Sequence, residues 1–374
     1  MTDQEAFLSA GVEQRWGDPV PKWPEGTGPA SFPASNYTDP ARLEREIELI
    51  FRREWFMVGH GSEIPNPGDY LVWEGLDESV FIARQDDGSV LGFFNVCQHR
   101  GTRLTRESGH CDQYLTCPFH GLSYNVAGQL KAVPFREDFD ETQLSGMDLV
   151  PVATREWNGL LWLNLAGDEA PPLEDALDVF VEDLAPWNMD DMVFNGRVER
   201  IVNCNWKVLI DGFLEAYHVP IVHSESIGDE IVVHEAWYHH FARNSSYYLP
   251  LLPTHENFAQ THDHVRYGQC HHFVFPTTII NGSVSQLQVY TTIPIDVDTC
   301  KFIAVHLIQP GLDPEQKAAM DKRWERYQVV VDEDMNLAEQ LAPTRRSRAY
   351  TTNRTNRQEV RLKHFHDVVG SIID

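Results

Sequence analysis

Residues 97–120, CQHRGTRLTRESGHCDQYLTCPFH, constrain the fold of this 374-residue chain more than any other stretch. They contain two pairs of candidate metal ligands with seventeen residues between the pairs: Cys97 with His99, and Cys117 with His120. A glycine follows each histidine closely and permits the tight turns that require a positive φ. We therefore expect each pair on its own loop between short strands, with the two loops facing one another across a metal.

Two kinds of metal centre compete for these four residues. A zinc site also accepts two cysteines and two histidines, but it usually places both cysteines in one loop and both histidines in the other. Mixed pairs are typical of a Rieske [2Fe-2S] cluster, in which two thiolates bind one iron and two imidazoles bind the other. The pattern C-x-H-x17-C-x2-H, with HRG and CPFHG, resembles the Rieske non-haem iron oxygenases. His110 and Cys111 match neither pattern, and we expect them to be a surface histidine and a packed thiol.

The rest of the chain predicts an α+β fold without a parallel dinucleotide-binding sheet. Short strand-like runs between turn residues precede Trp162, whereas the later strands come in groups with the helices set apart. The resemblance implies a small all-β Rieske domain and a helix-grip-like catalytic domain, an antiparallel sheet with a long C-terminal helix. We expect three regions: an N-terminal arm and the start of the first helix over residues 1–44, packing on the catalytic domain; the Rieske domain over 45–165; and the catalytic domain over 166–374.

A second metal site is expected in the segment NWKVLIDGFLEAYHVPIVH. Asp211, Glu215 and His218 are spaced to share one face of a helix. Pro220 should end or distort that helix, and His223 can then approach the same metal as His218. Two histidines need a carboxylate to complete the ligand set of a non-haem Fe(II) oxygenase.

A long helix from Pro314 to about Leu341 offers this carboxylate. Its start carries an aspartate cap and a glutamine at the third helical position. Its apolar stripe, which steps by three and four residues, places Asp334 toward the core, whereas Asp332 and Glu333 should point elsewhere. A buried carboxylate needs a cation or strong donors, so Asp334 is either a metal ligand, a partner of a buried arginine or a cap for another loop.

The resemblance covers nearly the whole chain and implies further roles. Asn205-Trp206-Lys207, Glu215, His218 and His223 reproduce the family's catalytic pattern, and Glu333-Asp334 its late acidic pair. The implied ligands of a mononuclear Fe(II) are His218, His223 and Asp334. Glu215 is implied as the carboxylate through which electrons reach the neighbouring subunit of a head-to-tail homotrimer. Asp211 and Asn205 complete the expected catalytic residues.

The implied activity is that of a terminal oxygenase component that uses O2. Because no G-x-G-x-x-G follows a strand, electrons from NAD(P)H must come through flavin in a separate reductase, with or without a ferredoxin. We expect hydroxylation, by one or two oxygen atoms, of a small aromatic or hydrophobic substrate. Aromatic side chains between Trp237 and Phe258 are candidates for the wall of its site, although they also fit ordinary sheet core.

Three alternatives stay open. Glu215 stands where most members carry aspartate and resembles the carnitine- and choline-type oxygenases, which favours oxidation or N- or O-demethylation of a quaternary ammonium or methylated substrate. Ala216 and Val219 argue against this alternative, because several carnitine-type members have cysteines at the positions beside the first histidine. The second alternative is a Rieske electron carrier without catalysis, and the third is a zinc-stabilised ligand-binding module.

Other histidine clusters lack a matching carboxylate spacing, and we expect none of them to bind a metal: His239-His240, His262-Asp263-His264, His271-His272 and His364-Phe365-His366. The chain has 56 acidic against 30 basic residues and a formal charge of −26. Such a surface repels phosphate backbones and anionic lipids, which argues against nucleic acid and membrane partners. The start of the chain lacks the features of a secretory signal, so we expect a cytoplasmic protein.

Overall fold

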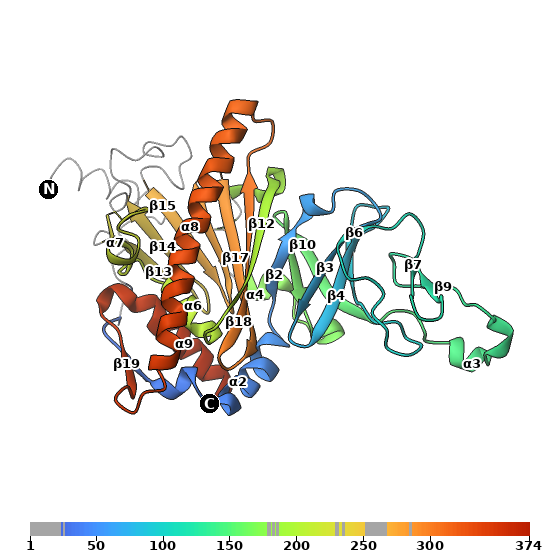
Figure 1. Cartoon of the computed structure of the whole chain (residues 1–374), viewed down its shortest axis with the longest axis horizontal. Coiled ribbons are helices and arrows are strands. Elements are labelled where there is room, and N and C mark those ends of the chain that lie inside the picture. Colours follow the sequence, from blue (N-terminus) through green and yellow to red (C-terminus); the bar gives the residue numbers. More distant parts are fainter. Residues whose placement is uncertain are drawn as a thin grey trace. The chain divides into compact units, whose positions relative to one another are not determined.

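The computed structural model describes residue 24 and residues 27–177, 181, 184, 187–228, 232–233, 236–250, 268–283 and 286–374 (Figure 1). These residues form two compact units. One consists of Phe51–Ala176 and Asn188–Asp190. The other consists of the described residues up to Ile50, of Leu177–Trp187 and of Asp191–Asp374. The predicted α+β class is confirmed, and no helix among the described residues is long and apolar enough to cross a membrane.

The first unit is built from antiparallel strands, as predicted. Its larger sheet has the order β2-β11-β10-β5-β4-β3-β6 and its smaller sheet the order β7-β8-β9. The strands are β2 (Phe56–His60), β3 (Asp69–Gly75), β4 (Glu78–Arg84), β5 (Val90–Phe94), β6 (Gly109–His110), β7 (Leu115–Thr116), β8 (Ser123–Tyr124), β9 (Leu130–Ala132), β10 (Pro151–Trp157) and β11 (Leu160–Asn164). Short helical segments connect them: η3 (Gly61–Glu63), η4 (Arg136–Asp138), α3 (Glu141–Leu144), η5 (Gly167–Glu169) and α4 (Leu173–Leu177), with η7 (Met189–Asp191) beyond.

The second unit contains a seven-stranded antiparallel sheet of order β12-β18-β17-β16-β15-β14-β13. Its strands are β12 (Val193–Val202), β13 (Trp237–His240), β14 (Ser245–Pro250), β15 (Gly268–Val274), β16 (Thr278–Ser283), β17 (Gln286–Asp296) and β18 (Thr299–Ile308). Strands β15 and β16 form a hairpin in which Val274 pairs with Thr278, and Phe275-Pro276 lies in the turn between them. Proline lacks the N–H needed inside a ladder, which explains the interruption.

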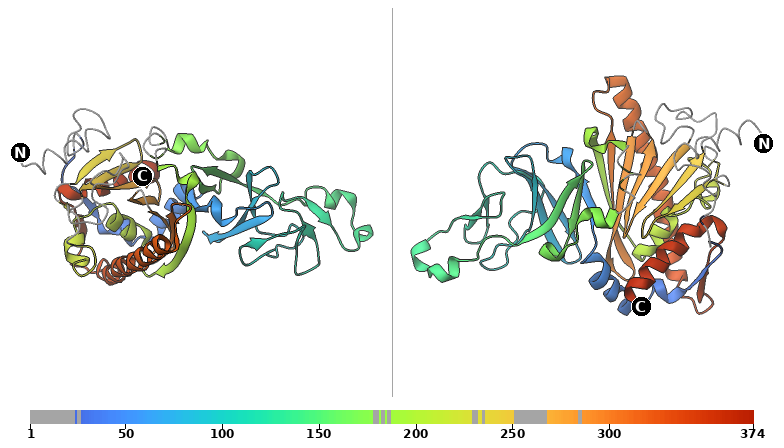
Figure 2. Two further views of the ribbon diagram at one scale, coloured as in Figure 1. Left: turned by 90° about the horizontal axis from the view of Figure 1, so that it is seen from above. Right: turned by 180° about the vertical axis from the view of Figure 1, so that it is seen from behind.

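Helix α8 (Pro314–Thr344) crosses one face of this sheet, and the view from behind in Figure 2 shows the strands from the opposite side. It starts where the sequence predicted. Asp313 accepts hydrogen bonds from the first-turn N–H groups, and the side-chain oxygen of Gln316 accepts one from the backbone N–H of Asp313. The predicted stripe is buried at Met320, Trp324 and Val331, so its periodicity correctly identified the face that packs on the sheet.

Both ends of the described chain meet in the second unit. Strand β1 (Ser31–Pro33) pairs with β19 (Thr352–Arg354). It is followed by η1 (Ala34–Tyr37), α2 (Pro40–Glu46) and the π-helical segment η2 (Ile47–Phe51), and β19 by η10 (Arg357–Glu359) and α9 (Val360–Ile373). Helix α2 starts at Pro40, and the side chain of Asp39 caps it by accepting the N–H of Ala41.

The helix expected to continue from Trp206 to His218 ends earlier. Helix α6 (Trp206–Phe213) stops before Glu215, and a separate helix, α7 (Val219–Val222), follows with His218 as its N-cap. The prediction that Asp211, Glu215 and His218 share one helical face is therefore wrong. Pro220 opens the second helix instead of ending the first, because a proline is tolerated in a first turn, where the N–H has no helical partner.

Candidate metal centres

The two Cys/His loops of the first unit have the same backbone hydrogen bonds. The N–H of Cys97 donates to the carbonyl of Thr102, and that of Gly101 donates to the carbonyl of Cys97. The loop of Cys117 repeats both bonds at the equivalent positions with the same lengths, 2.8 and 3.0 Å. Gly101 and Gly121 have φ of 74° and 80°, so the predicted need for glycine at these turns is confirmed.

These loops bring the four predicted cluster residues together. Burial raises the pKa of the Cys97 thiol, and the neighbouring thiol of Cys117 adds to the increase; the rings of His99 and His120 are 4.7 Å apart. The Nδ1 atom of His99 is buried without a hydrogen-bond partner among the described residues. The hydroxyl of Tyr124 lies 3.4 Å from the sulfur of Cys97. Two cysteine thiols and two imidazoles, one of which has an unpaired nitrogen, are the donor types that a [2Fe-2S] cluster of Rieske type requires.

The two remaining candidates in this stretch are not part of the group. His110 is exposed and pairs with Asp69 at 2.7 Å. Cys111 is buried in the apolar core of the unit. Both expectations, a surface histidine and a packed thiol, are confirmed.

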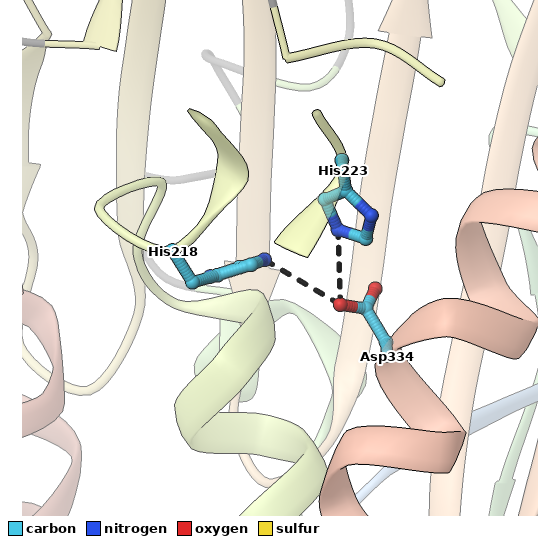
Figure 3. A group of neighbouring side chains, drawn as sticks. All are labelled: His218, His223 and Asp334. Atoms are coloured by element: carbon cyan, nitrogen blue, oxygen red, sulfur yellow. Dashed lines mark ion pairs between the residues drawn. The ribbon is translucent and has the colours of Figure 1, made fainter. Parts of the chain in front are cut away.

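His218, His223 and Asp334 converge in the second unit (Figure 3). The Nε2 atoms of His223 and His218 lie 3.0 and 3.5 Å from the same carboxylate oxygen, Oδ1 of Asp334. One ligand atom from each of the three side chains lies within 4.8 Å of the other two. Asp334 projects from α8, whereas the two histidines flank the short helix α7. The break before α7 thus allows both imidazoles to point at one carboxylate.

Each imidazole is also hydrogen-bonded by a second carboxylate, through the ring nitrogen that does not face Asp334. Nδ1 of His218 lies 2.5 Å from Glu215, and Nδ1 of His223 lies 2.7 Å from Glu333. A carboxylate can only accept, so each Nδ1 carries a proton, and each Nε2, which faces Asp334, would bind a metal through its lone pair after giving up its own proton. Carboxylates in this position orient metal-binding histidines and increase their basicity.

Glu333 corrects the sequence-based expectation. Asp332 is exposed, as expected, but Glu333 does not point away from the site, since it accepts hydrogen bonds from His223 and from the Ser226 hydroxyl. The helical stripe described only the face of α8 itself, and His223 approaches from another segment. The acidic run Asp332-Glu333-Asp334 was the available signal for it.

The electrostatics of the group match a site for a cation. Burial disfavours every charged form, but hydrogen bonds to Asp334 and Glu215 outweigh it and raise the pKa of His218 to about 10. The same balance, with Asp334 and Glu333, raises the pKa of His223, and bonds from both histidines hold that of Asp334 below its ordinary value. Two imidazole nitrogens and one carboxylate form the facial donor set of non-haem Fe(II) oxygenases, so the residues present fit mononuclear iron.

Asp211 and Asn205 make other contacts. Asp211 is buried and accepts hydrogen bonds from the hydroxyl of Tyr37 at 2.6 Å and from Nε2 of His366 at 2.9 Å. Asn205 caps α6 by accepting the N–H of Lys207, and its amide donates to Val297. Sequence reasoning missed this use of Tyr37, which is far away in the chain and carries no motif.

A cavity of about 210 Å³ lies beside the site formed by His218, His223 and Asp334, which we call the iron-type site. Its lining includes four carboxylates, those of Asp211, Glu215, Asp334 and Glu359, together with His218. Asn205 is not among the lining residues.

The other histidine clusters serve as packing and hydrogen-bonding groups where they are described. His240 stacks on His364, and His271 bonds the hydroxyl of Tyr290 at 2.8 Å. Within the described ranges, none of these clusters is part of a group of three or more ligand atoms close enough for a single metal ion; His218, His223 and Asp334 form the one such group. His262-Asp263-His264 and the aromatic stretch from residue 251 to Phe258 lie outside the described residues.

An all-β unit with mixed Cys/His loops, next in sequence to a sheet-and-helix unit with a two-histidine, one-carboxylate site, defines a Rieske-type non-haem iron oxygenase. Comparison with known proteins agrees. Residues 182–374 match the ring hydroxylating alpha subunit (catalytic domain) family, and residues 54–150 match the Rieske [2Fe-2S] domain.

Similar proteins act on two kinds of substrate. The carnitine monooxygenase oxygenase subunit of Acinetobacter pittii is 29% identical over 336 residues, 86% of each chain. The large oxygenase component of the naphthalene 1,2-dioxygenase system of Pseudomonas aeruginosa is 36% identical over 203 residues, 50% of this chain and 43% of that one. Among solved structures, the quaternary ammonium Rieske monooxygenase CntA with L-carnitine has a TM-score of 0.79 and 26% identity, over 92% of this chain and 96% of that one.

The chain belongs to the ring hydroxylating alpha subunit family of Rieske oxygenases. It is the oxygenase component of a Rieske system, an oxidoreductase that incorporates oxygen from O2, and its cofactors are a [2Fe-2S] cluster and a mononuclear iron. The expected family, fold class, enzyme class and cofactors are therefore confirmed.

Proposed function

We propose that this oxygenase oxidises or demethylates a small quaternary ammonium or N-methylated substrate. The supporting observation is a group of buried tyrosines, Tyr238, Tyr247 and Tyr290, in a chain similar over most of its length to carnitine monooxygenase oxygenase subunits. Aromatic faces attract methylammonium groups through cation–π interactions. Burial raises the pKa of Tyr247 and of Tyr290, and Asp334 adds a smaller contribution to both increases.

The proposed cluster ligands are Cys97, His99, Cys117 and His120, and the proposed iron ligands are His218, His223 and Asp334. When bound, the iron activates O2 and the cluster supplies electrons. The chain's own groups hold these ligands in place: Glu215 and Glu333 keep the Nδ1 protons of the two histidines, and Tyr124 contacts the sulfur of Cys97.

We also propose that Glu215 links the iron ligand His218 to the cluster of a neighbouring subunit in a head-to-tail homotrimer. Both of its oxygens are engaged by His218, one by Nδ1 and the other by the backbone N–H, and it lines the cavity beside the site. Electrons come from NAD(P)H through a separate reductase with flavin, with or without a ferredoxin. We propose a cytoplasmic location on the acidic composition of the chain.

Hydroxylation of an aromatic ring is the second candidate. It is favoured by the 36% identity to a naphthalene dioxygenase component, although that match covers half of this chain. The buried tyrosine rings would equally stack on an aromatic substrate.

The first test is a count of metals and acid-labile sulfide in anaerobically purified protein. About three irons and two sulfides per chain are expected, two irons in the cluster and one at the mononuclear site. The loaded protein is then supplied with NADH and a heterologous Rieske reductase, and oxygen uptake and products are measured with γ-butyrobetaine, L-carnitine and naphthalene. Turnover of naphthalene without turnover of either quaternary ammonium compound would replace the first candidate by the second.

A further inference from the structure

The cavity beside the iron-type site is lined by four carboxylates: Asp211, Glu215, Asp334 and Glu359. Histidine or tyrosine side chains donate hydrogen bonds to the first three, as described above. Donors of this kind stabilise the charged form of a carboxyl group. The fourth carboxylate, Glu359, has no side-chain donor among the described residues.

Glu359 accepts one hydrogen bond, and it comes from the backbone. Its Oε2 accepts the N–H of Asn356 at 2.7 Å, within the capping box of η10, and no described cation forms an ion pair with it. Burial raises the pKa of Glu359 above its ordinary value. Glu215 and Asp211 add to this increase, whereas the N–H of Asn356 opposes it. Of the four carboxyl groups, Glu359 therefore has the environment that most favours a bound proton.

Packing brings Glu359 close to the iron-type site. The next residue, Val360, belongs to a buried apolar cluster that includes Ala216 and Val219. These two residues lie on either side of His218 in the chain, and His218 lines the same cavity as Glu359. A cavity of about 210 Å³ has room for several water molecules, which can carry a proton from Glu359 to the site.

Charged and titratable groups reach Glu359 from several elements. In addition to the other carboxylates, they are His218, Tyr238 on β13 and Arg345, which follows α8. Arg345 is the one lysine or arginine that the structure places in the lining of this cavity. Arg345 and a bound Fe(II) would together carry three positive charges against the four carboxylates. A proton on Glu359 balances this difference, so the lining opposes its ionisation even with iron present.

The reaction of a Rieske oxygenase consumes protons as well as electrons. Two electrons and two protons are taken up with each O2, whether one oxygen atom leaves as water or both enter the product. The electrons arrive through the cluster, so an acid near the iron-type site must supply the protons. Glu215 and Glu333 are poor candidates, because their hydrogen bonds hold the Nδ1 protons of the two histidines.

We propose that Glu359 is the proton donor for oxygen activation. Its protonated carboxyl group gives a proton to water in the cavity, becomes a carboxylate and regains a proton from solvent before the next one is needed. The inference rests on the oxygenase class of the chain and is independent of the proposed substrate. A fixed acid at such a position typically accelerates a reaction about 10²–10⁴-fold, because the concentration of free protons near neutral pH is very low.

Glu359→Gln removes the acid and preserves the structure around it. The amide oxygen of glutamine can still accept the N–H of Asn356, so the cap of η10 is kept. Glu63→Gln is the matched control. Glu63 occupies the same capping-box position in η3, where it accepts the N–H of His60 at 2.9 Å, and it belongs to the other unit.

The first readout is an infrared titration of the iron-loaded protein without substrate. The wild type and Glu63→Gln should show a C=O stretch of a protonated carboxyl group that titrates above the ordinary pKa of glutamate. Glu359→Gln should lack this component. A titration that Glu359→Gln leaves unchanged would overturn the inference.

The second readout is the rate at which O2 reoxidises the reduced, iron-loaded protein. The absorbance of the cluster reports this rate, and protein without the mononuclear iron is the blank. It is measured without substrate and with γ-butyrobetaine, L-carnitine or naphthalene, so a failure of the proposed substrates leaves the test intact. The wild-type rate should fall as the pH rises through the infrared midpoint.

Glu359→Gln should react about tenfold or more slowly and lose this pH dependence, at unchanged iron content. A purely structural role of Glu359 would lower the iron content and leave the pH dependence of the remaining rate in place. That result, or a wild-type rate with the wild-type pH profile, would refute the proton donor.

Discussion

Replacing Glu333 by glutamine should weaken iron binding without disturbing the cluster. The carboxylate accepts two hydrogen bonds of 2.7 Å, from Nδ1 of His223 and from the hydroxyl of Ser226. A bond to a charged group contributes about 1.5–3 kcal/mol and a neutral one about 0.5–1.5 kcal/mol. Both bonds end on Oε2, so the amide oxygen of glutamine can still accept them but without the negative charge; because the Glu333 side chain is 27% exposed and its charge is screened, the net loss should be about 1–2 kcal/mol. That corresponds to roughly 5- to 30-fold weaker iron binding.

The assay is competition for the mononuclear iron by a ferrous chelator under anaerobic conditions, with cluster absorbance followed in the same sample. Asp332→Asn is the matched control, because Asp332 is exposed and its nearest cation, Arg200, is 3.8 Å away. Equal chelator midpoints for Glu333→Gln and Asp332→Asn would show that Glu333 does not support His223, and the reasoning from the hydrogen bonds would fail.

Three further predictions concern other parts of the molecule. Cys117→Ala should abolish the visible absorption of the cluster, while Cys111→Ala should retain it; absorption that survives in the former would exclude Cys117 as a ligand. Glu215→Gln should keep the cluster and weaken iron binding as Glu333→Gln does; at saturating iron it should still slow single-turnover product formation about tenfold or more, and a wild-type rate would eliminate the bridging role. Burial lowers the pKa of His306 from its ordinary value of 6.5 to about 4. As the pH falls, this histidine therefore takes up a proton in the unfolded chain before it does so in the folded one. Its contribution to stability is present above pH 6.5 and is lost as the pH falls toward 4. In urea unfolding, His306→Gln should remove about 2–3 kcal/mol of the stability difference between pH 7 and pH 4, and an unchanged difference would contradict the burial argument.

The parts of the fold that the sequence predicted well are those set by local chemistry. Asp313 and Gln316 identified the first residue of α8, and its period placed Asp334 toward the interior. The glycines after each Cys/His pair identified the turns, because few other residues adopt their φ values. These signals lie within a few residues of the structure that they determine.

The errors arose where distant segments meet. The end of α6 at Phe213 depends on Glu215, whose side chain accepts the N–H of His218 in place of a helical carbonyl. The role of Glu333 depends on the position of His223, which lies in another segment of the chain. Neither contact leaves a period or a motif in the sequence around it.

The contacts of Tyr37 also bear on the order in which parts of the protein can fold during synthesis. Its hydroxyl contacts Asp211 on α6 and His366 on α9, and strand β1 just before it pairs with β19. The environment of Asp211 is therefore complete only after synthesis has passed His366. The Cys/His loops, by contrast, belong to a unit whose residues have all been translated by Asp190. On the ribosome, the cluster unit can fold while the iron-type site still awaits its final helix.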